Sequence, residues 1–246
     1  MKLIVSLTSF PGRINIVHRV IKRMARQSVR PDKIVLYLSA LQFPNRVLPE
    51  KLSRMQGGGF EIRWLNSDFR GHKKLVPALR DFPNDMIVTV DDDIAYRRGA
   101  VETLLREHRA HPDCVIAMRA KNVDPAAKYA DWRKLNKKDD DFSAGFDKIG
   151  IGYGGILYPP RILHPDVSRP ELFMRIAPSA DDLWFWAMAV LNGKMIKPVK
   201  DYPHSPVVWF SQGIALRREN FRAGASKNDE AMARIIARYP ELLLKL

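Results

Sequence analysis

Short apolar segments alternate with segments of helical periodicity through the first half of this 246-residue chain. Most of the apolar segments have few polar positions, as strands buried on both faces of a parallel sheet do. Strands are expected at 2–7, 33–38, 60–64, 86–90 and 115–120, and helices at 15–27, 74–79 and 99–111. The alternation predicts an α/β fold whose mostly parallel central sheet is flanked by helices.

The second half follows this pattern less regularly. Residues 121–148 are charged and carry scattered aromatic side chains, which predicts a mobile or ligand-organised segment and not a core element. After a Gly-rich stretch at 149–160, we expect a helix from Asp181, a strand at 195–199 and a last helix from about Asn228. The sequence contains no internal repeat and no linker, so one compact domain is predicted.

The chain is strongly basic, with a formal net charge of +14 and a sequence pI of about 10.0. A charge of this size indicates anionic partners. Part of it lies on the helix expected at 15–27, whose apolar positions recur at helical spacing between Arg19, Lys22, Arg23 and Arg26. This cationic face is either an ordinary solvated surface or a docking surface for anionic lipid.

Two features bear on the compartment in which the protein works. The single cysteine, Cys114, cannot form an intrachain disulfide, which favours a reducing, cytoplasmic setting. The longest apolar run, residues 183–191, is much shorter than the ~20 residues needed to cross a bilayer. We therefore expect a cytoplasmic protein, which either stays in solution or contacts the inner face of the membrane.

Three consecutive aspartates, Asp91, Asp92 and Asp93, follow the strand expected at 86–90. Ligands of open parallel sheets bind outside the carboxyl ends of the strands. If the chain stays extended there, Asp91 and Asp93 share one side and Asp92 lies on the other. Two carboxylates on one side suit Mg²⁺ or Mn²⁺, which in turn suits a diphosphate. The alternative is a solvated acidic turn that caps a helix.

Two further polar segments belong to the same sheet edge in this arrangement. Thr8, Ser9 and Arg13 lie in the turn after the first strand and offer hydroxyls and a cation to a nucleotide. In the segment 66–75, Asp68 can accept from a base or a ribose, and Lys73 or Lys74 can meet phosphate oxygens. The alternatives are an ordinary strand-to-helix turn and solvated lysines.

The apolar run at 183–191 is apolar on every side, so its helix is expected to be buried, with Gly193 as its stop. Asp181 and Asp182 then lie at the positive end of that helix, which favours ionised carboxylates. We expect Asp181 to be the N-cap and Asp182 to be a candidate general base.

These motifs occur in an order that resembles the GT-A fold glycosyltransferases. The stretches that carry the likeness are "VSLTSFPGR", "HKKLVPAL", "VTVDDDI", "GYGGILYPP" and "ADDLWFWAMAVLNG". Together they are most similar to small bacterial, family-two-like enzymes that build surface polysaccharide or lipopolysaccharide. The resemblance implies a Rossmann-like GT-A domain over residues 1–246, with a nucleotide-sugar-binding half at 1–120 and an acceptor-binding, catalytic half at 121–246.

The resemblance also implies roles for the donor and metal residues. The acidic triplet corresponds to the DxD motif, with Asp93 as the main ligand of Mn²⁺ or Mg²⁺ and Asp91 touching the ribose, or the metal through water. Asp92 is counted with the donor-binding group, and His204 is the candidate histidine that completes the metal shell, although a structural role is the alternative. The residues expected to line the nucleoside pocket are Thr8, Ser9, Arg13 and Asp68.

For the reaction, the likeness implies that Asp182 is the base of an inverting transferase. Where many relatives have Glu-Asp this chain has Ala-Asp-Asp, which leaves the role of Asp181 open. Gly154 and Gly155 are expected to let the backbone approach the acceptor, and Trp184 or Trp132 to offer a flat face to a sugar ring. Core packing is the alternative for the tryptophans.

The expected activity is metal-dependent transfer of a sugar from a nucleoside diphosphate sugar, UDP-linked first of all, to a glycan or glycolipid hydroxyl. Two other classes stay open. A sugar nucleotidyltransferase shares the fold class and the metal chemistry, but the turn after the first strand lacks its usual Gly-rich phosphate loop. A basic nucleic-acid-binding protein would explain the charge but not the carboxylates, which repel phosphates.

Overall fold

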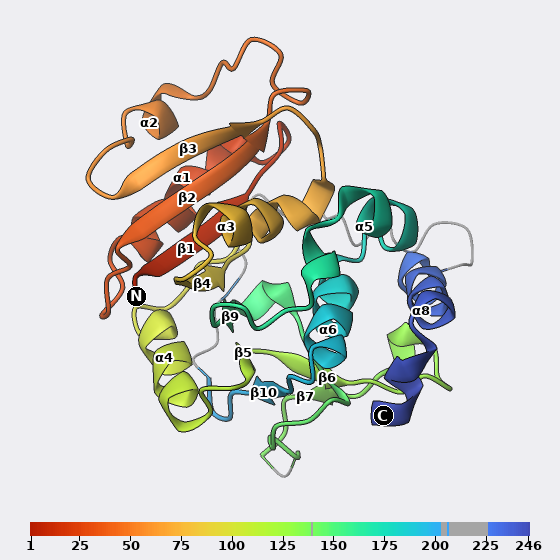
Figure 1. Ribbon diagram of the computed structural model, residues 1–246. Helices are drawn as coiled ribbons and strands as arrows, with labels where there is room; N and C mark the ends of the chain where they lie inside the picture. The colour runs from red at the N-terminus through yellow and green to blue at the C-terminus, as the bar shows by residue number, and fades with distance from the viewer. Residues whose placement is uncertain (139, 203–205, 207–225) are drawn as a thin grey trace.

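The computed structural model describes residues 1–138, 140–202, 206 and 226–246. A seven-stranded sheet forms its centre, in the order β10-β5-β9-β4-β1-β2-β3 (Figure 1). All neighbouring strands run parallel except β9, which is antiparallel to both β4 and β5. The strands are β1 Leu3–Thr8, β2 Lys33–Ser39, β3 Phe60–Leu65, β4 Met86–Thr89, β5 Val115–Ala117, β9 Ile156–Tyr158 and β10 Ile196–Pro198.

Helices cover both faces of this sheet, as the buried strands require. Leu3, Val5 and Leu7 of β1 pack in one core with α1 (Ile14–Met24) and α4 (Ala100–Ala110). Ile4, on the opposite face of the strand, packs in a second core with α3, α5, α6 and α8. These helices span Val76–Asp81, Pro170–Ile176, Asp181–Leu191 and Lys227–Arg238, and a short α2 at Glu50–Ser53 lies near α1. The expected single α/β domain is confirmed.

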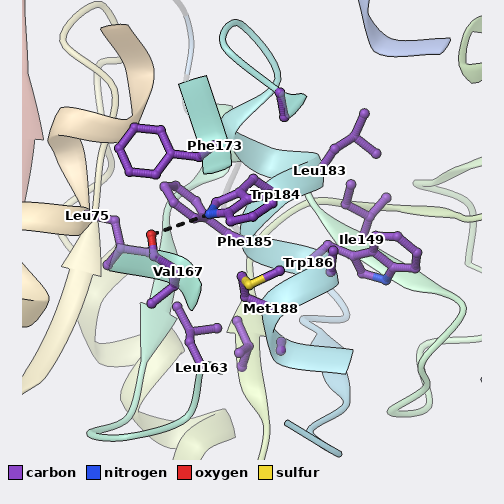
Figure 2. Packing of buried hydrophobic residues seen from close by; sticks show 14 of the residues in the cluster. Leu75, Ile149, Leu163, Val167, Phe173, Leu183, Trp184, Phe185, Trp186 and Met188 are labelled. Atoms are coloured by element: carbon purple, nitrogen blue, oxygen red, sulfur yellow. Dashed lines mark hydrogen bonds between the residues drawn. The ribbon is translucent and has the colours of Figure 1, made fainter. Parts of the chain in front are cut away.

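The α6 helix is buried around its whole circumference, as its uniformly apolar sequence predicts. All its residues from Leu183 to Val190 are buried. The Trp184 ring packs against Phe173, with ring centroids 6.4 Å apart, and its indole Nε1 donates to the carbonyl oxygen of Val167 at 3.4 Å (Figure 2). Burial of this many large side chains fixes α6 against the sheet, and with it the position of the two aspartates at its first turn.

A second sheet of three short strands lies beyond the end of β5, in the order β7-β6-β8. Its strands are Lys134–Leu135, Ala120–Asn122 and Lys148–Gly150. The single strand expected at 115–120 is therefore wrong in part, because the chain leaves the large sheet after Ala117 and enters the small one at Ala120. The segment 121–148 is also better packed than its polarity predicts, since Trp132 is buried and donates to the carbonyl of Asp124 at 2.8 Å.

The remaining short elements are 3₁₀ turns, of which three border the site described below. These three are η1 at Arg70–Lys74, η2 at Tyr129–Asp131 and η3 at Gly152–Gly154; η4 and η6 span Pro165–Ser168 and Pro240–Lys245. Within the part of the chain that the structure describes, no helix has the length and apolarity to cross a membrane.

Candidate active site

A cavity of about 1120 Å³ opens at the carboxyl ends of the parallel strands. The parallel register places Ser6 of β1 opposite Val35 of β2 and Thr89 of β4, so these strands end side by side. The turns that follow them therefore meet at one edge, where open α/β sheets bind their ligands. The predicted residues that line the cavity are Thr8, Ser9, Arg13, Asp68, Lys73, Lys74, Asp91, Asp92, Asp181 and Asp182.

Lys74, at the end of η1, is the central cation of the site. Its Nζ lies 2.8 Å from Asp181 Oδ2, 3.3 Å from Asp91 Oδ1 and 3.6 Å from Asp182 Oδ1. The residue is 7% exposed, and its carbonyl oxygen accepts from the Ser6 hydroxyl at 2.6 Å, which anchors it to β1. Although burial opposes its charge, the three carboxylates hold the pKa of Lys74 well above its ordinary value.

Two glycines let the backbone approach this cluster. A Cβ on Gly152 would lie 2.5 Å from Lys74 Nζ, and one on Gly71 would lie 2.6 Å from Asp181 Oδ1. The Gly152 N–H also donates to Asp182 Oδ2 at 3.0 Å. Neither close approach to this cluster could be predicted from the sequence, since it becomes visible only when the distant segments are brought together.

The two acids at the start of α6 differ in their proton affinity. Burial raises the pKa of Asp182 to about 7, and Lys74 offsets only part of that effect. Burial also opposes ionisation of Asp181, but its close contact with Lys74 and the nearby His72 bring its pKa below the ordinary value. Asp181 is not the N-cap that was expected: Ala180 occupies that position and the Asp181 side chain contacts Lys74 instead.

Arg13 holds the other two acids of the triplet. Its guanidinium NH1 lies 2.9 Å from Asp92 Oδ1 and 3.1 Å from Asp93 Oδ2, and the Ser9 hydroxyl donates to Asp92 Oδ2 at 2.6 Å. The expectation that Asp91 and Asp93 share one side is therefore wrong. Because β4 ends at Thr89, the triplet forms a turn that directs Asp92 and Asp93 to Arg13 while Asp91 contacts Lys74.

Lys73 is also held by polar groups of the protein. Its Nζ pairs with Asp68 and donates to Gln42 Oε1 at 2.8 Å, and the residue is 1% exposed. The exposed cation of this segment is Arg70, which lines the cavity and donates to the Ser179 hydroxyl at 3.0 Å. Arg70 adopts a φ of 50°, a left-handed conformation that the sequence does not signal, and it was missed in the sequence analysis.

Three predicted acceptor residues do not face the cavity. Trp184 is 0% exposed within the α6 core, so its ring is not available to a sugar, which corrects the expectation. Gly154 and Gly155 are not among the described residues that line the cavity. A Cβ on Gly154 would meet Arg119 and Met118, and Gly155 has a φ of 93°, so these glycines shape the turn into β9. Their neighbours Ile151 and Tyr153 line the cavity instead.

Of the predicted metal ligands, the structure describes Asp91 and Asp93 but not His204. His204 lies outside the described residues. Among those that are described, no group of three His, Cys, Asp or Glu side chains is arranged to hold a metal ion. Asp93 contacts Arg13, whereas Asp91 lines the cavity and has a side chain that is 30% exposed.

The charge of the cluster nevertheless fits an additional cation. Five carboxylates, those of Asp91, Asp92, Asp93, Asp181 and Asp182, surround the two cations Arg13 and Lys74, a formal charge of −3 when all are ionised. Burial raises the pKa of Asp93 to about 6 and that of Asp182 to about 7, so a further cation beside them would favour their ionised forms. Asp91 is the carboxylate most open to a cation in the cavity.

A second wall of the cavity comes from the small sheet and from α8. It includes Arg119, Lys121 of β6, Tyr129 of η2, Lys134 of β7 and Lys227 of α8. None of these residues was singled out as a site residue from the sequence. They come from segments about 100 positions apart, so only the folded chain places them together.

Comparison with known proteins gives a fold and no family. No protein-family model and no curated protein matches the chain. Among solved structures, S. aureus TarS 1–349 in complex with UDP aligns over 100% of this chain and 75% of its own, at 15% identity and a TM-score of 0.55. A mannosyltransferase from Pyrobaculum calidifontis, in complex with GDP-Man and Mn²⁺, aligns over 99% and 72%, at 15% identity and a TM-score of 0.53.

The CMP-2-keto-3-deoxy-manno-octonic acid synthetase complexed with CTP aligns over 89% of this chain and 98% of its own, at 14% identity and a TM-score of 0.52. Glycosyltransferases and nucleotidyltransferases thus share this architecture. The protein has a GT-A-like fold.

Proposed function

We propose that this protein is a bacterial glycosyltransferase that moves a sugar from a nucleoside diphosphate sugar to an acceptor hydroxyl, with inversion, in polysaccharide or lipopolysaccharide synthesis. The observation that carries the proposal is the position of Asp182: a carboxylate with a pKa of about 7 that lines the cavity at the edge of a nucleotide-binding fold. A group with that pKa can accept a proton near neutral pH.

The donor half of the proposal rests on the turns after β1, β3 and β4. Thr8 and Ser9 offer polar groups for the nucleoside, and Arg70 is the exposed cation available for a phosphate oxygen. The TarS structure is a complex with UDP and the mannosyltransferase structure is a complex with GDP-Man, which supports a nucleoside diphosphate as the ligand here. We assign residues 1–120 to donor binding and residues 121–246 to acceptor binding and catalysis.

A divalent cation is part of the proposal because the acid cluster lacks positive charge. Asp91 would hold it, and His204 and Asp93 stay proposals as further ligands. The mannosyltransferase structure that includes Mn²⁺ supports this choice. When bound, such an ion supplies charge stabilisation for the leaving diphosphate.

The protein's own residues supply the remaining chemistry. The acceptor oxygen forms a bond to the anomeric carbon while the bond to the diphosphate oxygen breaks, and that oxygen keeps the electron pair. Asp182 takes the hydroxyl proton. The Gly152 N–H and Lys74 orient the Asp182 carboxylate, and Asp181 keeps Lys74 charged, so neither Lys74 nor Asp181 needs to contact substrate.

A nucleotidyltransferase is the second candidate, because the CTP-bound synthetase aligns with this chain over nearly its whole length. Such an enzyme would transfer the nucleoside monophosphate group of a nucleoside triphosphate to a sugar or sugar phosphate and release pyrophosphate. The turn after β1 argues against it, since Arg13 is engaged by Asp92 and Asp93 and does not point freely at a triphosphate site.

The experiment that separates these functions measures which product is released. Purified protein with Mn²⁺ is incubated with UDP-sugars and GDP-sugars, and separately with CTP or UTP and a free sugar or sugar phosphate. The proposal predicts slow release of UDP or GDP from a nucleotide sugar and no pyrophosphate. Pyrophosphate release would establish the nucleotidyltransferase, and failure of every nucleotide to raise the melting temperature would reject both.

We further propose that the enzyme works in the cytoplasm and contacts an anionic membrane through α1. Arg19, Lys22 and Arg23 are exposed on this helix, and Arg26 is exposed in the turn that follows it. In the described part of the chain no carboxylate forms an ion pair with any of them. A lipid-linked glycan acceptor would lie at the surface of such a membrane.

A further inference from the structure

Three cations of the far wall, Arg119, Lys134 and Lys227, pair with no carboxylate of the described residues, in contrast to the cations of the donor side. On the donor side Arg13, Lys73 and Lys74 are all paired with aspartates. On the far wall, no ion pair joins Arg119, Lys134 or Lys227 to a carboxylate of the described residues. The difference is unexpected in a site that already contains five aspartates.

Arg119 and Lys121 are held in place by aromatic rings and carbonyl groups. The Arg119 guanidinium lies over the rings of Tyr153, at 4.6 Å from the centroid, and Tyr202, at 5.7 Å. Lys121 Nζ lies 3.9 Å from the Tyr129 ring centroid and donates to the Tyr129 carbonyl at 2.9 Å. These contacts orient the two cations, and an aromatic ring or a carbonyl group carries no formal charge to offset theirs.

Lys227 is brought to the cavity by an anchored helix. The side chain of Asp229, in the first turn of α8, accepts from the Tyr129 N–H at 2.6 Å, which joins α8 to η2. Lys227 and Asn228 then reach the same cavity as Lys134 of the small sheet. The positive end of the α8 dipole adds to the charge of this wall.

We propose that this wall is the binding site for a negatively charged group on the acceptor, a phosphate or a carboxylate close to the hydroxyl that reacts. The inference rests on the proposed glycosyl transfer and names the class of its acceptor. Asp181 and Asp182 line the same cavity, and they would repel an anionic acceptor unless nearby cations outweighed them. Arg119, Lys134 and Lys227 supply those cations. A neutral glycan would offer no anionic group to pair with them.

The test uses small probes that carry only the proposed chemistry. Glycerol 3-phosphate, glycerate and glycerol are titrated into wild-type protein saturated with Mn²⁺ and UDP or GDP, and binding is followed by NMR line shifts. The inference predicts that glycerol 3-phosphate or glycerate binds and that glycerol does not. The stronger of the two anions identifies whether phosphate or carboxylate is the recognised group.

Variants then locate the probe. In Lys134→Ala/Lys227→Ala we expect the Kd of the anion to rise at least ~10-fold, from loss of charge-assisted contacts, with unchanged nucleotide binding and melting temperature. Lys138 is an exposed lysine in the turn after β7 and does not line the cavity. Lys138→Ala is therefore the matched control and should leave the Kd of the anion unchanged.

Two results would overturn the inference: anion binding no tighter than glycerol binding, or an anion Kd that the double variant leaves unaltered. Failure of the proposed function looks different. In that case UDP and GDP would not bind to the wild-type protein at all, while the anion Kd would still respond to Lys134→Ala/Lys227→Ala.

Discussion

Replacement of Lys74 by methionine tests whether this buried cation holds the acid cluster together. Methionine fills a similar volume but leaves Asp91, Asp181 and Asp182 without their shared counter-charge. Removing one partner of a buried ion pair costs ~3–5 kcal/mol. The partner carboxylates are 18–30% exposed, so solvent screens them in part and the lower end, ~3 kcal/mol, applies. For a domain of this length that lowers the melting temperature by ~6–12 °C at pH 7.5.

The pH dependence of this loss has a definite sign. The pKa of Asp181 is lowered in the folded protein, so its pairing with Lys74 stabilises the protein above the ordinary carboxyl pKa and is lost as pH falls through the lower folded value. The pKa of Asp182 is raised to about 7, so this group lowers the stability of the folded protein as pH rises from the ordinary carboxyl pKa to about 7, and more so without Lys74. The difference in melting temperature between Lys74→Met and wild type should therefore be largest at pH 7.5, smaller at pH 5 and smallest below pH 4.

Thermal unfolding followed by circular dichroism from pH 3.5 to 8 measures this difference. Lys138→Met, an exposed lysine outside the cluster, is the control and should unfold within about 1 °C of wild type. A Lys74→Met variant that unfolds within 2 °C of wild type at pH 7.5, or whose loss does not change with pH, would refute the account of Lys74.

Three further predictions concern the same site and its surroundings. Gly152→Ala should lower the free energy of unfolding by ~1–3 kcal/mol and remove most of the activity, because the new Cβ would lie 2.5 Å from Lys74 Nζ. Gly99→Ala, whose Cβ would have no atom within 4 Å, is the control and should lower the free energy of unfolding by ~0.5 kcal/mol or less in the same urea unfolding experiment. Asp91→Asn should weaken the binding of UDP or GDP in the presence of Mn²⁺ at least ~10-fold in calorimetry, and should leave their binding without metal unchanged. If wild-type protein binds the nucleotides equally well with and without Mn²⁺, the proposed metal is contradicted. Arg23→Ala/Arg26→Ala, at the end of α1 and just beyond it, should weaken sedimentation with phosphatidylglycerol vesicles by ~30-fold, at about 1 kcal/mol per charge, and leave turnover of soluble substrates intact. Wild-type protein that does not sediment with such vesicles would contradict the membrane contact.

Much of the fold could be predicted because the relevant signals are local. The strands β1 to β4 are short apolar runs between helical patterns, and α6 is too apolar to lie anywhere but in the core. The antiparallel β9 was missed, since Ile156–Tyr158 is only three residues long and lies next to a Gly-rich stretch. Its place between β4 and β5 depends on long-range pairing that no local pattern encodes.

The site could be predicted at the level of segments and not of contacts. The expected turns do meet at one cavity, because parallel strands end together. Which acid pairs with which cation was not predictable: Asp91 and Asp93 were expected on one side of an extended chain, but the strand ends at Thr89, before the triplet begins. The positions of Lys74 among three aspartates and of Gly152 beside it depend on segments up to 108 residues apart, from Lys74 to Asp182.

The central claim is that Asp182 removes the acceptor proton, and the pH profile of Asp182→Asn tests it most directly. With wild-type protein, transfer at saturating donor should rise tenfold per pH unit below a pKa of about 7 and level off above it. Asp182→Asn should bind UDP or GDP as wild type does, lose at least ~100-fold in transfer and lose this pH dependence. Transfer by Asp182→Asn at the wild-type rate, with the same profile, would contradict the account.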